Sequence, residues 1–496
     1  MANRGEIACR ILRACKEAGH PTVAICAPND AGSLFTEMAD QVVMLKGETI
    51  AETYLDQQQI IQAALDTGAT AIHPGFGFLS ERAEFATAVQ SAGLTWIGPS
   101  AMAIEKMGDK MTARQTMRAA GVPVIPGEEV EEVDEGMALE ALRQAAERVG
   151  YPLLLKASSG GGGKGMRAVH DPADFDSAAA GARREAVAAF GDGRIYIERL
   201  LSGSKHVEIQ VLADQHGRTV HLGERECSVQ RRHQKVFEEA PGPTMTEALR
   251  EAMGQAAVAA AEAVNYVGAG TVEFLLAPTG EFFFLEMNTR IQVEHPVTEL
   301  VTGVDIVREQ LRIADGEPMS CGPLMIRGHA IEVRLYAEDA ASGFLPSIGP
   351  LAVFRPPEGP GIRLDTGVRE GDDVTPNYDP MLAKLIVWAP SRPEALEKMR
   401  RALDEFVVLG TTTNIEFLRD LCDAGPVVAG STTTTTIEEL WPNGWNPPAD
   451  AMLEEAALLA AASAETLGLH RVRTRISSDL TDGPASPFTT LNRRFP

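Results

Sequence analysis

Hydrophobic and polar residues in the segment 271–294 form a pattern that predicts a β-hairpin followed by a further extended stretch. Two β-rich runs flank Thr279-Gly280, and a two-residue loop at these positions would close the hairpin. In that register Glu273 lies opposite Glu286. Because facing carboxylates on neighbouring strands repel one another, the pair indicates a cation between them, and a hard ion such as Mg²⁺ is the natural candidate.

Beyond the hairpin the alternation continues, with a polar side chain at every second position and mostly apolar residues between. If this segment is extended, its polar groups lie along one face. A half-exposed strand with a solvated face is the alternative, but the opposed glutamates favour a functional site. The polar residues are Glu286, Asn288, Arg290, Gln292 and Glu294.

Residues 1–107 show helical and extended patterns in alternation, which predicts an α/β layer with a parallel sheet. A doubly wound unit should begin with a strand, whereas the first pattern here is helical. We therefore expect either a start upstream or an incomplete edge of the sheet. The predicted helices cover 6–18, 51–67 and 82–92, and the predicted strands cover 22–27, 69–73 and 94–97.

A second unit follows an acidic linker at 128–135 and opens with a strand at 152–156 that leads into the glycine-rich loop 158–165. Consecutive glycines let backbone N–H groups approach a polyphosphate closely, and lysines in the same segment supply positive charge. The loop is not a Walker A motif, because Ser158 stands where that motif needs glycine. With a returning strand at 166–169, the segment predicts a flexible flap over phosphates, and a plain turn is the alternative.

Four basic or imidazole groups lie within residues 231–235, which in an acidic protein indicates a local anion site rather than a solvated loop. After residue 318 the pattern changes to short strands and a helix at 391–407, which predicts an α+β domain. The remaining predicted elements are strands at 196–201, 206–213, 328–336, 351–355 and 382–388, helices at 246–264 and 450–468, and linkers at 431–436 and 441–448.

Length and composition narrow the class of protein. A chain of 496 residues is too long for one core and indicates about three domains. The net charge of −24 argues against nucleic acid as a partner, since phosphates need a basic surface. The six cysteines show no metal-type spacing and indicate buried thiols in a reducing compartment. No apolar run approaches the ~20 residues that span a bilayer and no signal peptide is recognisable, so a cytoplasmic protein without a membrane partner is expected.

Several of these segments together resemble biotin carboxylase, and the similarity covers residues 2 to about 436. The run Glu286-Met-Asn-Thr-Arg-Ile-Gln-Val-Glu-His-Pro-Val-Thr-Glu299 is close to a signature of that family by itself. The other matching segments are Ala2-Asn-Arg-Gly-Glu-Ile, His73-Pro-Gly-Phe-Gly-Phe-Leu-Ser-Glu81, Met107-Gly-Asp-Lys110, the loop 158–165, Val207-Glu-Ile-Gln-Val211 and Gln230-Arg-Arg-His-Gln-Lys235.

The resemblance implies an ATP-dependent ligase of mixed α/β and α+β class that forms a homodimer. Its activity would be the carboxylation of biotin on a carrier protein with ATP and bicarbonate, through carboxyphosphate, as the first half-reaction of an acyl-CoA carboxylase. The cofactors would be ATP and Mg²⁺ or Mn²⁺, and the partners a biotin carboxyl carrier protein and a carboxyltransferase subunit. The implied domains are a Rossmann-like N-terminal domain at 1–107 that lacks its first strand, an ATP-grasp domain at 108–320 with a mobile glycine-rich lid at about 128–202, a biotin carboxylase C-terminal domain at 321–436, and a linker with a helical tail at 437–496.

The resemblance also implies roles for individual residues. Glu294 would be the base that deprotonates bicarbonate, and Arg334 would stabilise the enolate-like oxygen of biotin. The metal would be held by Glu273, Glu286 and Asn288. Bicarbonate would be bound by Lys235, Arg290, Gln292 and Val293, and Lys235 and Arg290 would also take part in catalysis. ATP would be bound by Lys110, Lys156, Gly162, Gly163, Glu198, Arg199, Leu200, Leu201, His206, Gln230, His233 and Leu275.

The chain also departs from the family pattern. Arg199 stands where many members have lysine, although the family contact there is largely through the backbone. The part beyond residue 440 resembles the start of the region that follows the carboxylase in long acyl-CoA carboxylase α-chains, but the sequence contains no Met-Lys-Met biotin acceptor. The biotin is therefore expected on another chain, or this chain is a fragment. Two alternatives stay open: another bicarbonate-activating ATP-grasp ligase, such as a carbamoyl-phosphate synthetase-like enzyme, and a catalytically inactive assembly module.

Overall fold

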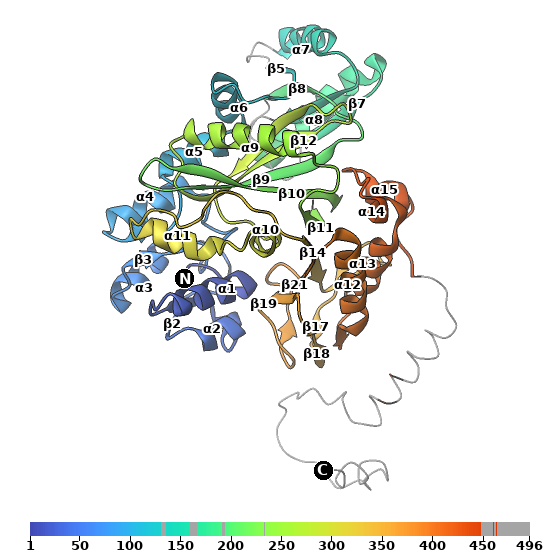
Figure 1. Cartoon of the computed structure of the whole chain (residues 1–496). Helices are drawn as coiled ribbons and strands as arrows, with labels where there is room; N and C mark the ends of the chain where they lie inside the picture. Colours follow the sequence, from blue (N-terminus) through green and yellow to red (C-terminus); the bar gives the residue numbers. More distant parts are fainter. Residues whose placement is uncertain are drawn as a thin grey trace.

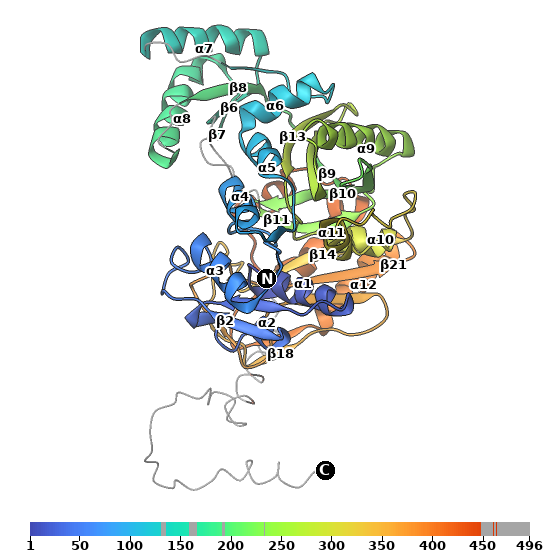
Figure 2. The ribbon, with the colours of Figure 1, turned by 90° about the vertical axis from the view of Figure 1, so that its left-hand side faces the viewer.

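The computed structural model describes residues 1–129, 135–157, 166–190, 194–232 and 234–447, together with 460 and 463. Its elements form an N-terminal group, a small sheet with two helices, a long central sheet and a C-terminal helical layer (Figure 1). The small sheet lies at one end of the molecule, and the N-terminal and C-terminal groups lie at the other (Figure 2). No described helix is long and apolar enough to cross a membrane.

An antiparallel sheet of eight strands runs through the centre in the order β13-β12-β9-β10-β11-β14-β21-β19. Its register pairs 237–240 with 330–333, so the hydrogen bonding continues between the regions on either side of residue 320. The strands are β9 (Lys205–Ala213), β10 (Thr219–Arg231), β11 (Gln234–Ala240), β12 (Gly268–Leu276), β13 (Phe282–Asn288), β14 (His329–Tyr336), β19 (Ile362–Thr366) and β21 (Met381–Ala389).

Alternation along β9 gives the sheet one apolar and one polar face. Val207 and Ile209 pack with Ala257 of α9 (Glu247–Glu262) in a buried hydrophobic cluster. Glu208 and Gln210, at the positions between, are fully buried polar side chains. Because successive side chains of a strand point to opposite faces, these two residues lie on the face away from α9, where the candidate site is found.

The hairpin register predicted from the sequence is confirmed, but the predicted turn is wrong. Glu273 pairs with Glu286, as expected. The loop covers residues 277–281 rather than two residues, and Gly280 takes its positive φ of 89°. A bulge in β13 leaves Leu285 as an extra residue between the pairs Phe274–Phe284 and Glu273–Glu286, which compensates for the longer loop and restores the predicted pairing.

The extended stretch predicted beyond the hairpin is also wrong. Strand β13 ends at Asn288, the chain bends, and α10 begins at His295 (His295–Thr302). The bend is held from outside the segment, because Glu81 accepts hydrogen bonds from Thr289 N at 3.2 Å and from Arg290 Nε at 2.9 Å. The polar residues of the segment therefore converge by bending rather than by sharing one strand face.

The small sheet has the order β5-β8-β6-β7 and carries two helices, which form its hydrophobic core with the strands. The strand, loop and returning strand predicted around the glycines are confirmed in their described parts, since β6 and β7 pair antiparallel. Residues 127–129 form an edge strand, so the predicted linker is wrong there, and the loop 158–165 lies outside the described residues. The elements are β5 (Gly127–Glu129), α7 (Glu135–Val149), β6 (Leu153–Ala157), β7 (Met166–Val169), α8 (Phe175–Phe190) and β8 (Ile195–Arg199).

In the N-terminal group the predicted parallel pairing is confirmed, but it is split into two separate pairs, β1 with β2 and β3 with β4. The predicted helix at 51–67 is shorter, because Asp56 caps it by accepting from Gln58 N and Gln59 N. The elements are α1 (Gly5–Glu17), β1 (Val23–Cys26), α2 (Leu34–Met38), β2 (Gln41–Met44), α3 (Gln57–Thr67), β3 (Ala71–Ile72), α4 (Ala83–Ser91), β4 (Thr95–Trp96), α5 (Ala101–Gly108) and α6 (Lys110–Ala119).

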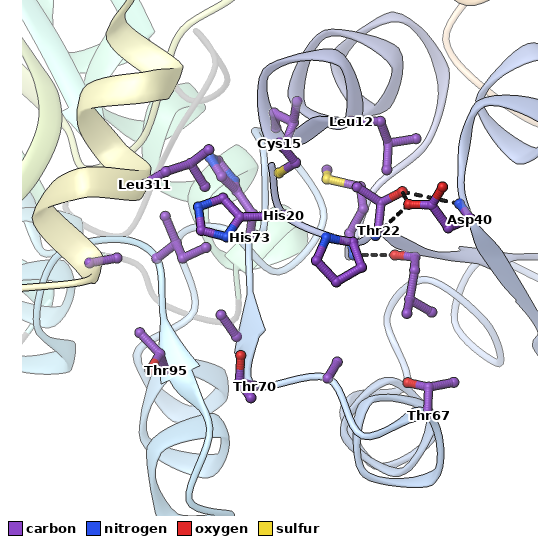
Figure 3. Close-up of a pocket in the computed structure, with 18 of the residues that line it drawn as sticks. Leu12, Cys15, His20, Thr22, Asp40, Thr67, Thr70, His73, Thr95 and Leu311 are labelled. Carbon is purple, nitrogen blue, oxygen red and sulfur yellow. Dashed lines mark hydrogen bonds between the residues drawn. The ribbon is translucent and has the colours of Figure 1, made fainter. Parts of the chain in front are cut away.

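A cavity of 340 Å³ lies between β1 and β3, where a continuous sheet would have another strand. Thr22 and Asp40 line one side of it and Thr70 and Thr95 the other (Figure 3). Among the described residues, α1 is the first element of the chain. The backbone of Met1 and Ala2 links the two pairs, because Met1 N donates to Val23 O at 2.6 Å and Ala2 N donates to His73 O at 3.0 Å, but these residues form no strand in the described structure.

The C-terminal group packs α12 against β14 and β21, and α13 against α12, in one buried hydrophobic cluster. The strands predicted at 328–336, 351–355 and 382–388 correspond to β14, β18 and β21. The predicted linkers at 431–436 and 441–448 are wrong in their described parts, because Thr432 Oγ1 donates to Glu226 Oε1 at 2.7 Å and Trp445 is buried. The predicted tail helix at 450–468 lies outside the described residues except for 460 and 463. The remaining elements include α11 (Ile306–Ala314), β18 (Val353–Arg355), α12 (Arg392–Glu405), β22 (Val407–Leu409), α13 (Ile415–Asp423), α14 (Gly425–Ala429) and α15 (Thr436–Leu440).

The split in the N-terminal sheet predicts low local stability there. Hydrogen exchange followed by mass spectrometry should show faster amide exchange in β1 and β3 than in β9 and β12, which have strands on both sides. Equal protection in the two regions would contradict the expectation that the cavity-facing edges open readily.

Candidate active site

The candidate site is built around Lys235 of β11, whose ammonium group lies among three buried carboxylates. Lys235 Nζ lies 2.5 Å from Glu208 Oε2 and 2.7 Å from Glu294 Oε1. It also lies 3.0 Å from Glu273 Oε1. Burial acts to lower the pKa of Lys235, but the three carboxylates outweigh it and hold that pKa well above its usual range. Lys235 is therefore a permanent cation that ties three strands and a loop together.

Glu294 lies between two cations at the start of α10. Its second oxygen, Oε2, accepts from Arg334 Nη2 at 3.0 Å, and Arg334 Nε donates to Glu238 Oε1 at 2.6 Å. Burial acts to raise the pKa of Glu294, but Lys235 and Arg334 outweigh it and hold the pKa well below its usual range. Glu294 is thus a buried carboxylate, 2% exposed, that can accept a proton from a bound substrate.

Arg225 of β10 fixes the orientation of Glu208 and Gln292. Its fully buried guanidinium lies 2.5 Å from Glu208 Oε1 and 2.6 Å from Gln292 Oε1. Because Arg225 holds the amide oxygen of Gln292, the amide nitrogen points to Glu273, and Gln292 Nε2 donates to Glu273 Oε1 at 2.7 Å. The geometry leaves Gln292 and Glu273 in fixed orientations beside Lys235.

The paired glutamates of the hairpin offer oxygen ligands for a divalent cation. Glu273 is buried, lies 3.1 Å from Asn288 Nδ2, and its Oε2 lies 2.9 Å from His206 Nε2. Glu286 is exposed at the opening of the site and forms no hydrogen bond or ion pair with the described residues. The surrounding protein, together with the charge of Glu273, raises the pKa of Glu286. Carboxylate and amide oxygens fit a hard ion such as Mg²⁺ or Mn²⁺, which would relieve this repulsion.

Lys110 of α6 and Lys156 of β6 lie near one another, beside Glu286 and Glu198. Burial, aided by Lys156, lowers the pKa of Lys110, while Glu286 and Glu198 act in the opposite direction. Glu198 is buried, and its carboxylate is paired with Arg114 and with Lys156 at 2.5 Å. In this structure the side chain of Glu198 is therefore engaged with Arg114 and Lys156, and Lys156 would have to loosen this ion pair to meet an anion.

The other residues predicted to bind nucleotide are placed as follows. His206 and Leu275 face each other across β9 and β12, and Gln230 pairs with Lys235 across β10 and β11. The backbone N–H groups of Arg199 and Leu200 donate to Pro126 O and Pro152 O, and Leu201 follows them at the end of β8. Gly162, Gly163 and His233 lie outside the described residues.

Arg290 contacts other protein groups of the bend. Its Nη2 donates to Asn288 Oδ1 at 2.6 Å and its Nε to Glu81. The backbone carbonyl of Val293 accepts a hydrogen bond from Lys384 Nζ at 2.8 Å. Both residues lie in the bend between β13 and α10, beside the carboxylates around Lys235.

Four residues of the site were missed in the sequence. Glu208 could have been found, because Val207-Glu-Ile-Gln-Val211 shows the same alternation that drew attention to 286–294. Glu81, Arg225 and Glu238 carry no such local signal, and only their partners in other elements show that they belong to the site.

Comparison with known protein families covers nearly the whole described chain. Residues 1–104 match the biotin carboxylase N-terminal domain, and residues 332–439 match the biotin carboxylase C-terminal domain. Residues 109–321 match the ATP-binding domain of the carbamoyl-phosphate synthase L chain.

Curated relatives include a biotin carboxylase of Nostoc, which is 48% identical over 89% of this chain and 98% of its own length. The methylcrotonoyl-CoA carboxylase subunit alpha of rice is 49% identical over 88% of this chain, but the chain spans only 59% of that relative. A solved biotin carboxylase domain dimer of 2-oxoglutarate carboxylase from Hydrogenobacter thermophilus, with MgADP, ADP and bicarbonate, has a TM-score of 0.84 and 44% identity, covering 89% of this chain and 96% of the other. A Campylobacter jejuni biotin carboxylase complex with a β,γ-ATP ligand has a TM-score of 0.84 and 40% identity, covering 88% and 97%.

The paired glutamates predict a measurable metal site. Glu273→Gln and Glu286→Gln should each weaken Mn²⁺ binding by about tenfold or more, because each removes one charged oxygen ligand. Electron paramagnetic resonance of free Mn²⁺ measures the effect. Glu281→Gln, in the exposed loop of the same hairpin, is the control and should bind Mn²⁺ like the unsubstituted protein. Unchanged binding in both hairpin variants would place the metal elsewhere.

A pH dependence follows from Glu238. Burial raises the pKa of this carboxyl to about 7 against the opposing charge of Arg334, and Glu294 adds to the rise. Because the pKa of Glu238 is higher in the folded than in the unfolded protein, its protonated form stabilises the folded state. This stabilisation is complete at acid pH and is lost as the pH rises through about 7. Glu238→Gln cannot ionise, so its free energy of unfolding relative to the unsubstituted protein should rise between about pH 5 and pH 8, by at most ~1.4 kcal/mol per pH unit. Urea denaturation across this range measures it, and a constant difference would contradict the assignment.

Proposed function

Because this chain belongs to the biotin carboxylase family, we propose that it uses ATP and bicarbonate to carboxylate biotin held on a carrier protein. It is an ATP-dependent ligase. The observation that carries the proposal is the placement of the Glu294 carboxylate between Lys235 and Arg334, one cation suited to bicarbonate and one to biotin.

In the first step Glu294 accepts the proton of bicarbonate. The freed oxygen attacks the γ-phosphorus of ATP, the bond to the β-phosphate oxygen breaks, and carboxyphosphate and ADP form. Lys235 and Gln292, with the backbone of Val293 and the guanidinium of Arg290, would hold the bicarbonate. For Arg290 this requires leaving its present contacts with Glu81 and Asn288.

The nucleotide would be held at the opening of the site. Glu273, Glu286 and Asn288 would hold Mg²⁺ or Mn²⁺, which when bound neutralises charge on the transferring phosphates. Lys110 and Lys156 would meet the phosphate oxygens. The remaining nucleotide contacts that we propose are those of Gly162, Gly163, Glu198, Arg199, Leu200, Leu201, His206, Gln230, His233 and Leu275.

In the second step carboxyphosphate breaks down to CO₂ and phosphate, the released phosphate accepts the proton of the ureido nitrogen of biotin, and that nitrogen attacks CO₂ to form carboxybiotin. Negative charge then develops on the ureido oxygen, where Arg334 would stabilise it. The two steps are linked by charge. Once Glu294 holds the proton from bicarbonate, it attracts Arg334 less strongly, and the guanidinium is left to face the developing anion.

We propose that the chain acts with a separate biotin carboxyl carrier protein and a carboxyltransferase, and as a homodimer like the 2-oxoglutarate carboxylase domain. Which acyl-CoA the assembly would carboxylate depends on that other subunit. The cytoplasmic location expected from the cysteines stays a prediction, since relatives include mitochondrial subunits.

A second candidate is a carbamoyl-phosphate synthetase-like ligase, because residues 109–321 match that ATP-binding domain. Both reactions activate bicarbonate, so the metal site does not separate them. Arg334 and the match of 332–439 to the biotin carboxylase C-terminal domain favour biotin. Phosphate release from ATP with bicarbonate should be stimulated by free biotin; stimulation by ammonia instead would reverse the order of the two candidates. An inactive assembly module is disfavoured, because the expected catalytic side chains are present.

The division of the site into a phosphate end and a biotin end is testable. Glu286→Gln should lower bicarbonate-dependent ATP cleavage by about 100-fold or more, because it removes a metal ligand. Arg334→Ala should keep part of that cleavage and lower carboxybiotin formation by about 100-fold or more, because it removes a cation that acts on the second step. Phosphate release and carboxylation of biotin with ¹⁴C-bicarbonate measure the two activities. The control is Arg355→Ala, which removes an exposed arginine of β18 and should leave both unchanged. Equal loss of both activities in both variants would contradict the division.

A further inference from the structure

Lys384 of β21 is a fully buried lysine that has no part in the mechanism above. Its Nζ lies 3.1 Å from Glu6 Oε2 of α1 and 3.7 Å from Asp365 Oδ2 of β19. Burial acts to lower the pKa of Lys384, but these carboxylates outweigh it and raise the pKa. The side chain is therefore a buried ammonium, and a buried charge of this kind is kept where its hydrogen bonds are used.

The third contact of this ammonium is with the active site. Lys384 Nζ donates to the carbonyl oxygen of Val293 at 2.8 Å. Across the sheet Lys384 is the direct partner of Arg334 on β14, and Arg334 Nη2 donates to the Glu294 carboxylate at 3.0 Å. Lys384 and Arg334, which are neighbours on adjacent strands, therefore hold two consecutive residues. Lys384 holds Val293 by its backbone, and Arg334 holds Glu294 by its side chain.

The segment that they hold lies between elements. Strand β13 ends at Asn288 and α10 begins at His295, so residues 289–294 follow no strand of the sheet. Its position depends on contacts from other parts of the chain. Glu81 holds its first residues, Arg225 holds Gln292, and Arg334 with Lys235 holds Glu294. Without the contact from Lys384, the peptide that joins Val293 to Glu294 could turn and carry the Glu294 carboxylate away from Lys235.

We propose that Lys384 is a positioning residue for the bicarbonate step, which fixes the peptide between Val293 and Glu294, and that Glu6 holds Lys384 in place from α1. The inference rests on the proposed function. It makes the N-terminal helix part of the support of the active site, because Glu6 belongs to α1 and lies 3.1 Å from Lys384. A displacement of reacting groups by about 1 Å can lower a rate about 100-fold, so a contact of this kind is large enough to be seen in kinetics.

The same contacts could serve only to join α1 to the C-terminal strands, and the kinetics distinguish the two roles. Lys384→Met should lower kcat/KM for bicarbonate in ATP cleavage by about 10-fold to 100-fold, while KM for MgATP stays within about twofold. Lys384→Arg keeps a charged donor and should recover part of the loss. Lys398→Met is the matched control. Lys398 Nζ also donates to backbone carbonyls, those of Pro360 and Trp388, but these residues are far from Val293 in the chain. This variant should leave kcat/KM for bicarbonate unchanged.

Thermal unfolding is measured for every variant beside the kinetics. A fall in the midpoint for Lys384→Met with kcat/KM for bicarbonate within about twofold of the unsubstituted protein would overturn the inference. If Lys384→Met does not fold, Lys384→Arg and Glu6→Gln take its place, and Glu6→Gln removes the ion pair but leaves the hydrogen bond to Val293. A smaller loss of kcat/KM for bicarbonate in these variants supports the inference. Unchanged kinetics in both variants overturns it. Absence of bicarbonate-dependent ATP cleavage in the unsubstituted protein would instead overturn the proposed function.

Discussion

The balance of buried charge around Lys235 is the constraint on which the rest of the structure depends. Three carboxylates from two strands and a loop meet one ammonium, and a buried carboxylate without a partner would cost several kcal/mol. Arg225 and Arg334 supply the remaining positive charge from β10 and β14. Every one of these groups must be present at once, so the strands that carry them can adopt only one arrangement relative to one another.

The eight-stranded sheet provides that arrangement. Over β9, β10 and β12 its apolar face is covered by α9, which leaves the opposite face for polar side chains. Support for the site also comes from outside the sheet, since Glu81 bends the chain after β13 and Glu6 reaches Lys384 from α1. Glu286, at the end proposed to hold the phosphates, is exposed, whereas Glu294 is buried. This difference suits a charged nucleotide that must enter and a proton transfer that must exclude water.

Much of the fold could be predicted because local patterns dominate it. The helices, the hairpin and the paired strands around the glycine loop follow from periodicity in their own residues. The register of Glu273 with Glu286 was right although the turn was wrong, because the bulge and the longer loop compensate. The threonine run near 431–436 was misjudged as a linker, since composition carries no information about Thr432 bonding to a strand two hundred residues earlier.

The sequence by itself determined which groups are available for chemistry: the opposed glutamates, the basic cluster that contains Lys235, and the alternating polar residues up to Glu294. Only the tertiary structure decided how they meet. It ended the strand at Asn288, turned Arg290 toward Glu81, paired Glu198 with Lys156, and brought Arg225 and Lys384 to the segment before α10. The physical reason is that periodicity reports which face of an element is buried, whereas the partner of a buried charge is chosen by the order of strands that lie far apart in the chain.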